Sequence, residues 1–382
     1  MRIFIISRGY PTPQSPQWGC FEKDQAEALA ALGHEVVMLS IDTRFRLAYR
    51  KFGITERYIN GVHSLDFFYR PSATYLGYIR RTLSVRLQLL YILKKAIKRF
   101  GKPDVLYSHY LFRSVDAVWV GNRKHIPVIG IEHWSKLNSN PMPLNVRWMG
   151  EYTYPKLNAI IAVSQPLAQR IQEFFHTKTV HVIHNTYSSD FYYTPNAPDD
   201  TFKMVSTGSL LYGKGFDLLI QALHKSSLVK TNWQLSIIGE GEEHTRLQAQ
   251  IDAAHLQNHI HLLGKRDKPF IADMLRQSSC FILPSRGENF SVAVLEALAC
   301  GLPIIASITG GIRECIDEKN GLLFEVNDID GLTRCIEQMA AHYQDYDRQA
   351  IADDCQARFS PQVIAQQLTK IFEETIAAYR VK

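Results

Sequence analysis

The sequence predicts an α/β protein with two doubly wound, parallel sheets. Short apolar runs of strand length alternate with amphipathic helical patterns through both halves of the chain. The length of 382 residues is comfortable for two domains. Residues 190–200 are rich in Pro, Asn, Asp and Tyr without periodicity, as is typical of a linker between domains.

We therefore predict four parts, in the order in which the patterns change. They are a first domain over residues 1–185, a linker over 186–200, a second domain over 201–358 and a final segment over 359–382. Strands are expected in the first domain at residues 2–7, 35–40, 104–107, 127–131 and 159–163, with an amphipathic helix over 20–32. In the final segment, residues 361–379 have the pattern of another amphipathic helix.

In the second domain, four predicted strands each run into a loop rich in glycine or charge. The first, 202–206, precedes a loop that ends Gly213-Lys214-Gly215, and the next two precede Gly239 and the pair Gly264-Lys265. The fourth, 280–284, precedes Glu288, and a helix is expected from Asn289. Because ligands bind at the carboxyl ends of parallel strands, the four loops are expected to surround one site.

These loops favour a ligand that carries both phosphate and hydroxyl groups. Lys214 offers a positive charge beside accessible backbone, and a helix N-terminus near Asn289 suits a diphosphate. Carboxylates such as Glu288 and Glu296 bind hydroxyls, so the two features together indicate a sugar nucleotide. The two carboxylates would lie about 12 Å apart if one helix covered both, which is too far for the acid/base pair of a glycosidase.

The charge of the chain is divided unevenly between its halves. The net charge is +6, but residues 1–185 hold 25 Lys and Arg against 12 Asp and Glu, so the remainder is acidic. Residues 79–102 form a basic amphipathic pattern without any acidic residue, and further cations lie nearby at Arg44, Arg46, Arg50, Lys51 and Arg57. This pattern predicts either contact with an anionic membrane surface or a solvated cationic face. No nucleic-acid-binding module is recognised.

Compartment and metal use are also predicted from the sequence. The six cysteines lack C-x-x-C spacing, which favours free thiols in a reducing compartment, and no membrane-spanning run or secretory signal is recognised. A cytoplasmic protein is therefore expected. Asp345-Tyr346-Asp347 has the form of a metal-binding motif, but its polar, helix-like surroundings favour solvated surface, and no metal is expected.

The segment from Pro284 to Ala306, with Glu288 and Glu296 in E-x7-E spacing, resembles the retaining nucleotide-sugar glycosyltransferases of family 4. Gly213-Lys214-Gly215, Gly239-Glu240-Gly241 and Asn185 also match. The resemblance implies the GT-B fold, in which two Rossmann-like domains face each other across a cleft, and a last helix that crosses back to the first domain. It further implies a hexosyltransferase that uses a nucleoside diphosphate sugar and a glycan or lipid-linked acceptor.

Carried over by position, the resemblance implies a role for each matching residue. Glu288 and His133 would contact the donor sugar, Lys214 would stabilise the diphosphate, and Glu296 would hold the ribose. The remaining donor-binding positions would be Gly19, Ser209, Gly239, Gly264, Lys265, Arg286, Asn289, Phe290 and Ser291.

Two positions depart from the family pattern. Cys20 follows Gly19 where a second glycine is common, and Ser209 stands where many members have an arginine that assists the lysine. Arg286 or Arg8 is a candidate for the missing charge. Alternative functions are another GT-B enzyme, of epimerase or phosphorylase type, and a GT-B protein that binds without catalysis.

Overall fold

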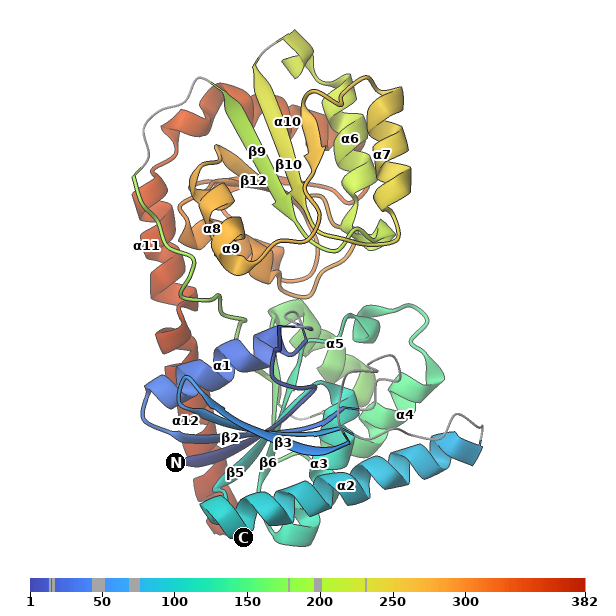
Figure 1. Ribbon diagram of the computed structural model, residues 1–382, viewed down its shortest axis with the longest axis vertical. Coiled ribbons are helices and arrows are strands. Elements are labelled where there is room, and N and C mark those ends of the chain that lie inside the picture. Colours follow the sequence, from blue (N-terminus) through green and yellow to red (C-terminus); the bar gives the residue numbers. More distant parts are fainter. Residues whose placement is uncertain are drawn as a thin grey trace. The chain divides into compact units, whose positions relative to one another are not determined.

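A computed structural model describes residues 1–13, 15, 18–42, 52–68, 76–177, 179–195, 201–230 and 232–381, the side chains of 76–83 and of 229–230 excepted. The chain forms two compact units (Figure 1). The first contains Met1–Thr186 together with Pro361–Lys382, and the second contains Tyr187–Ser360. Of the cations noted near the basic segment, Arg44, Arg46, Arg50 and Lys51 lie outside the described residues.

The first unit is built on an eight-stranded sheet in the order β3-β4-β2-β1-β5-β6-β7-β8. All neighbouring strands are parallel except β3 and β4, which form an antiparallel hairpin at one edge. The strands are β1 (Arg2–Ser7), β2 (Glu35–Asp42), β3 (Gly53–Ile59), β4 (Val62–Phe68), β5 (Val105–His109), β6 (Val128–Glu132), β7 (Ala159–Ala162) and β8 (His181–Val182).

Helices cover both faces of this sheet (Figure 1). They are α1 (Cys20–Ala31), α2 (Leu76–Phe100), α3 (Leu111–Lys124), α4 (Leu144–Thr153), α5 (Gln165–Phe175) and α12 (Pro361–Arg380), with short 3-10 turns at Ser135–Asn138 and Tyr154–Lys156. The last helix, α12, packs beside α1, and its Phe372 ring lies 4.9 Å from that of Tyr107. Both rings are fully buried, so α12 is part of the core of the first unit.

The second unit has a six-stranded, wholly parallel sheet in the order β11-β10-β9-β12-β13-β14. Its strands are β9 (Phe202–Thr207), β10 (Trp233–Ile238), β11 (Ile260–Leu262), β12 (Cys280–Leu283), β13 (Ile304–Ser307) and β14 (Gly321–Phe324). Its helices are α6 (Phe216–Lys225), α7 (His244–Ala253), α8 (Lys268–Arg276), α9 (Val292–Ala299), α10 (Ile329–His342) and α11 (Arg348–Phe359), with 3-10 turns at Tyr212–Lys214, Ser227–Lys230, Ile312–Glu314 and Tyr343–Asp345. Continuous apolar strands fit this sheet because helices bury both of its faces.

The predicted pair of doubly wound sheets is confirmed. Two expectations need correction. The β3–β4 hairpin is absent from the predicted strands, because β3 consists of exposed and half-buried residues and the largely buried β4 is interrupted by His63, Ser64 and Asp66. Helix α9 begins at Val292, three residues later than expected, with Ser291 as its N-cap. Glu288 therefore lies on the loop, and the helical rise does not apply to its separation from Glu296.

Candidate functional site

The four loops singled out from the sequence follow strands that are consecutive in the second sheet, β11, β10, β9 and β12. The backbone N–H of Gly239 donates to the carbonyl of Gly264 over 3.0 Å. A Cβ on Gly239 would lie 1.8 Å from the carbonyl oxygen of Gly208, so only glycine permits this approach. The turns after β9, β10 and β11 therefore form one continuous edge.

Glu288 lies on the loop between β12 and α9, where two side chains hold its carboxylate. The Ser285 hydroxyl donates to Glu288 Oε1 over 2.8 Å, and Lys214 Nζ donates to the same oxygen over 2.5 Å. The side chains of Lys214 and Glu288 are 30% and 14% exposed, so the pair is open to solvent and to a ligand. The structure thus brings together two of the residues predicted to bind the donor.

A glycine pair after β13 packs against the loop that contains Glu288. The N–H of Gly311 donates to the carbonyl of Asn289 over 2.8 Å. Gly310 has φ +48°, and a Cβ there would lie 2.2 Å from the carbonyl oxygen of Glu288. Sequence reasoning missed this support, although glycines in the loop after a strand are the same signal that marked the other loops.

Arg286 joins the Lys214 loop to the Glu288 loop. Its backbone N–H donates to the Gly213 carbonyl over 2.8 Å, and its guanidinium donates to the Tyr212 carbonyl over 2.6 Å and lies over the Tyr212 ring. The same guanidinium forms a bidentate ion pair with Asp217, with both N–O distances 2.8 Å. Partial burial would raise the pKa of Asp217, but the hydrogen bonds from Arg286 outweigh it and hold the pKa below its ordinary value.

The other predicted donor-binding residues of the second unit flank this pair. Asn289, Phe290 and Ser291 are buried between Glu288 and the start of α9, and Phe290 packs near Phe359. Glu296 lies half-buried in the second turn of α9. Ser209 and Lys265 are exposed, on the loops after β9 and β11 respectively.

In the first unit, Gly19 and Arg8 lie in the loop region after β1. Gly19 has φ +80°, and a Cβ there would lie 1.8 Å from the carbonyl oxygen of Gly9. Arg8 forms a bidentate pair with Glu22, at 2.7 Å and 3.0 Å, and lies over the Tyr110 ring. Burial would raise the pKa of Glu22, but Arg8 holds it below its ordinary value.

His133 follows β6 and is held by two neighbours. Its Nδ1 lies 3.0 Å from Asn185 Oδ1, and its Nε2 lies 3.3 Å from Nδ1 of His109, whose ring stacks on it. Burial lowers the pKa of His133 to about 4 and that of His109 to about 3, so both imidazoles are neutral at pH 7. With both ring nitrogens engaged in this way, His133 is positioned as part of a hydrogen-bonded chain.

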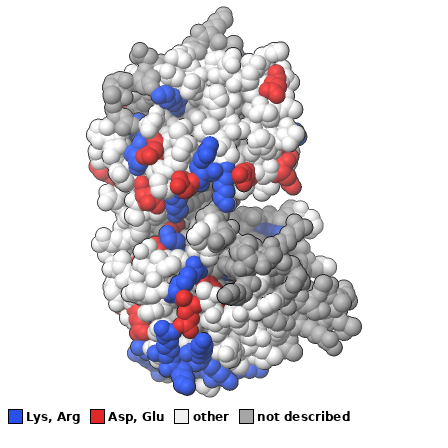
Figure 2. All heavy atoms as spheres, in the orientation of Figure 1, with Lys and Arg blue, Asp and Glu red and all other residues white. Residues whose placement is uncertain are grey.

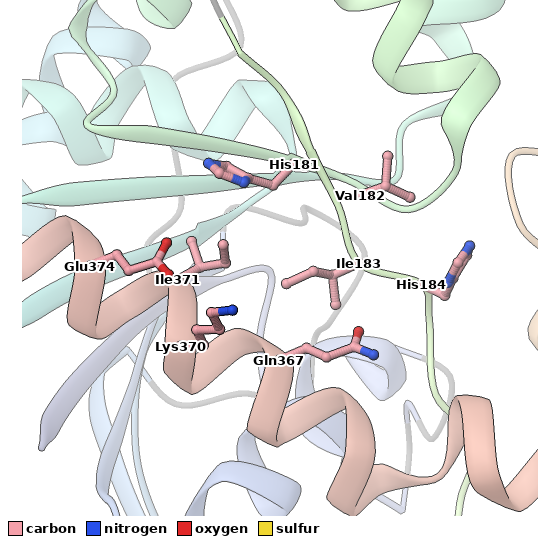
Figure 3. Close-up of a pocket in the computed structure, with 8 residues that line it drawn as sticks. All are labelled: His181, Val182, Ile183, His184, Gln367, Lys370, Ile371 and Glu374. Carbon is pink, nitrogen blue, oxygen red and sulfur yellow. The ribbon is translucent and has the colours of Figure 1, made fainter.

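The first unit also has a groove between the edge strand β8 and helix α12 (Figure 3). The lining residues are His181, Val182, Ile183, His184, Gln367, Lys370, Ile371 and Glu374. Neither Gly19 nor His133 is among them. The groove is therefore separate from the predicted donor-binding residues.

The two aspartates of the Asp345-Tyr346-Asp347 motif have structural partners. Asp345 contacts His342 Nδ1 over 3.0 Å, and Asp347 caps α11 by accepting from the N–H of Ala350. Within the described ranges, no group of three or more His, Cys, Asp and Glu side chains is arranged to hold a metal ion. All six cysteines are free thiols.

Two protein-family models match the chain. The model described as Glycosyltransferase Family 4 matches residues 23–191, and the model described as Glycosyl transferases group 1 matches residues 194–352. A curated relative, an uncharacterized glycosyltransferase of Methanocaldococcus jannaschii, is 29% identical over 238 residues. The match covers 62% of this chain and 65% of that protein, so the chain spans slightly less than two thirds of its length.

Two solved structures are similar over almost the whole chain. Sucrose-phosphate synthase from Thermosynechococcus elongatus superposes with a TM-score of 0.77 at 20% identity, covering 99% of this chain and 100% of that one. HepE from Anabaena, solved in complex with UDP, gives a TM-score of 0.74 at 18% identity, covering 98% and 99%. At these identities the likeness shows the fold, and it confirms the predicted GT-B architecture.

Proposed function

Because the chain belongs to the family 4 glycosyltransferases, whose two family models together match most of it, we propose that it moves a hexose from a UDP- or GDP-sugar to a glycan or lipid-linked acceptor. Members of this family transfer sugars from nucleotide sugars and retain the anomeric configuration. We place the reaction in the biosynthesis of a cell-surface polysaccharide or glycoconjugate. The observation that carries the proposal is the contact of Lys214 with Glu288 at the carboxyl end of the second sheet.

In the proposed reaction, the barrier is the charge that develops on the departing diphosphate. Lys214 and the N-terminus of α9, near Asn289 to Ser291, stabilise that charge, because fixed positive groups need no reorganisation as the bond breaks. Glu288 accepts hydrogen bonds from sugar hydroxyls, and Glu296 accepts them from the ribose. With the charge met by these groups, the proposed chemistry needs no divalent metal.

The charge missing at Ser209 is not simply supplied by Arg286 or Arg8. Each of these guanidiniums already has a buried or nearly buried carboxylate partner, Asp217 or Glu22. We therefore propose that Lys214 acts without an assisting arginine, and that Arg286 positions the Lys214 loop. His133 would contact the donor sugar, and its hydrogen bonds with His109 and Asn185 would hold its ring in place.

A donor panel tests the proposed function. The protein is incubated with UDP-, GDP- and ADP-sugars, and both release of the nucleoside diphosphate and binding are measured. Turnover or binding of one sugar nucleotide is expected. Failure of every member of the panel in both measurements would contradict the proposal, and binding without turnover, with or without a range of acceptors, would favour a non-catalytic GT-B protein.

The proposed acceptor class includes lipid-linked molecules, and helix α2 has features suited to an anionic membrane surface. Exposed cations gather over its C-terminal half, at Lys94, Lys95, Lys98 and Arg99 (Figure 2). Leu87 and Tyr91, 51% and 55% exposed, continue the same helix face as Lys94 and Lys98. A face that combines apolar and cationic side chains is typical of helices that lie in the membrane interface.

Helix α4, which contacts α2 through Arg86, has an exposed aromatic side chain. Trp148 is 58% exposed and stacks on Tyr152, over which Arg86 of α2 lies. Part of the positive charge is compensated, because Glu56 pairs with both Lys95 and Arg99. Among the described helices, none is both long and apolar enough to cross a membrane. We propose a peripheral contact on the cytoplasmic side.

Vesicle sedimentation tests this contact. Binding to phosphatidylglycerol vesicles is expected to exceed binding to phosphatidylcholine vesicles and to fall with added salt. Lys98→Glu is expected to weaken binding severalfold, whereas Lys319→Glu, an equal charge change in the second unit, should not. Equal partitioning to both vesicle types would remove the membrane proposal and leave the donor chemistry untouched.

A further inference from the structure

Lys214 and Glu288, which are proposed to hold different parts of the donor, are hydrogen-bonded to each other. Lys214 Nζ lies 2.5 Å from Glu288 Oε1, and the Ser285 hydroxyl donates to the same oxygen. An ionised carboxylate beside the ammonium competes with a diphosphate for its hydrogen bonds and also repels the diphosphate. The contact with Glu288 thus partly neutralises the charge of Lys214.

The backbone on both sides of the pair is fixed, so the two side chains stay within reach of each other. Arg286 bonds both the Gly213 and the Tyr212 carbonyls, and Asp217 fixes its guanidinium. A Cβ on Gly215 would lie 1.9 Å from the carbonyl oxygen of Pro284, which shows how closely the two loops approach. These contacts leave rotation of the two side chains as the way for either residue to change partner without separation of the loops.

We propose that the Lys214–Glu288 pair makes binding of the diphosphate depend on the sugar. When the donor binds, sugar hydroxyls donate hydrogen bonds to the Glu288 carboxylate and replace Lys214 as its partner. The Lys214 ammonium then turns to the diphosphate. After transfer the sugar is gone, Glu288 pairs with Lys214 again, and the nucleoside diphosphate loses its main cation. The pair favours the complete donor over the spent nucleotide and assists product release.

This inference rests on the proposed function, and isothermal titration with UDP tests it. Wild-type protein, Glu288→Gln, Lys214→Ala and the double variant are compared, with thermal unfolding as a check of folding. Glu288→Gln keeps the shape of the side chain and removes its charge, so it should bind UDP about tenfold more tightly than the wild type. In the Lys214→Ala background the same change should gain less than about threefold.

Kinetics provide the second readout. In Glu288→Gln the affinity for UDP and the transfer rate should move in opposite directions, since the variant loses a sugar contact while it gains a diphosphate contact. General loss of structure would weaken both. Glu318→Gln removes an exposed carboxylate of the same unit and should leave both unchanged. Glu288→Asp, whose shorter carboxylate reaches Lys214 less well, should give an intermediate gain and serves if Glu288→Gln fails to fold.

Two results would overturn the inference while the wild type binds UDP. One is unchanged or weaker UDP binding by folded Glu288→Gln and Glu288→Asp. The other is an equal gain in UDP affinity from Glu288→Gln with and without Lys214. That result would show that Glu288 only repels the diphosphate and does not compete for Lys214. A wild type that binds no member of the donor panel would instead overturn the proposed function, and with it this inference.

Discussion

Each unit has a cation–carboxylate pair near the carboxyl end of its sheet, but the two pairs differ in burial. Glu22 is fully buried, and Arg8 encloses it with two hydrogen bonds. Glu288 and Lys214 are both partly exposed and share one contact. A buried bidentate pair exchanges partners only at a large desolvation cost, whereas an open single contact exchanges readily. The first pair is thus suited to holding a loop, and the second to releasing a ligand group.

The largest expected effect comes from breaking the buried pair. Arg8→Ala leaves the Glu22 charge buried without its partner, so the free energy of unfolding of the first unit should fall by about 3–5 kcal/mol. Urea unfolding followed by tryptophan fluorescence measures this, because four of the five tryptophans lie in the first unit. Arg99→Ala, which removes a half-exposed partner of Glu56, should change stability by less than about 1 kcal/mol.

The open pair is expected to show the opposite behaviour. Glu288→Ala removes a proposed sugar contact without opening the core, so transfer should fall about 100- to 1000-fold with little loss of stability. Donor turnover and thermal unfolding measure the two quantities. Glu318→Ala is the matched control. A wild-type rate in Glu288→Ala would refute the role of this carboxylate and remove the functional side of the comparison.

Asp217→Asn tests whether the Arg286–Asp217 pair of the second unit fixes a loop, as the Arg8–Glu22 pair does in the first. The change weakens the fixing of Arg286 and thereby the placement of Lys214, so kcat/KM for the donor should fall about 10- to 30-fold. Asp217→Glu keeps the charge and should restore most of the activity. Asp330→Asn, at an exposed pair with Lys225, is the control. Equal activity of Asp217→Asn and wild type would show that Arg286 needs no carboxylate.

The smallest expected effect is a pH dependence confined to the first unit. His109 and His133 have folded pKa values of about 3 and about 4, below the unfolded value of about 6.5. Below pH 6.5 the unfolded chain therefore binds more protons at these two histidines than the folded chain, so the histidines destabilise the first unit as the pH is lowered. Burial raises the pKa values of Glu132 and Asp116, and these carboxyls act in the opposite direction. At pH 5.5 the contribution of His109 should lower the free energy of unfolding by about 1 kcal/mol relative to pH 7.0. The charges of the neighbouring Arg8 and Glu22 largely compensate each other.

Hydrogen exchange at pH 7.0 and 5.5, corrected for intrinsic rates, measures this loss. The histidine contribution is obtained by comparing peptides from β5 and β6 in the wild type and in His109→Gln, with peptides from β9 and β12 as the reference. On going from pH 7.0 to 5.5, the β5 and β6 peptides of His109→Gln should keep more protection than the same peptides of the wild type. Equal changes in the wild type and in His109→Gln would show that His109 does not contribute to the pH dependence.

Local patterns predicted most of the fold, because buried parallel strands are continuous apolar runs. Residues 2–7 and 361–379 match β1 and α12 within one residue. Local patterns did not predict β3 or the late start of α9, because both depend on the segments that pack against them. The same limit applies to the site. Glu288 and Lys214 have local signals, whereas the partner of Arg286 is 69 residues away and Asp217 has no signal of its own.

The contribution of α12 to the core of the first unit affects how the protein is made. During synthesis, Met1–Thr186 leaves the ribosome before the residues that complete it, and the whole of the second unit emerges in between. Until Pro361–Arg380 follows, Tyr107 lacks the aromatic neighbour Phe372. The second unit, which is continuous in sequence, can close first, and the nascent first unit is the part of the chain for which chaperones would have the most use.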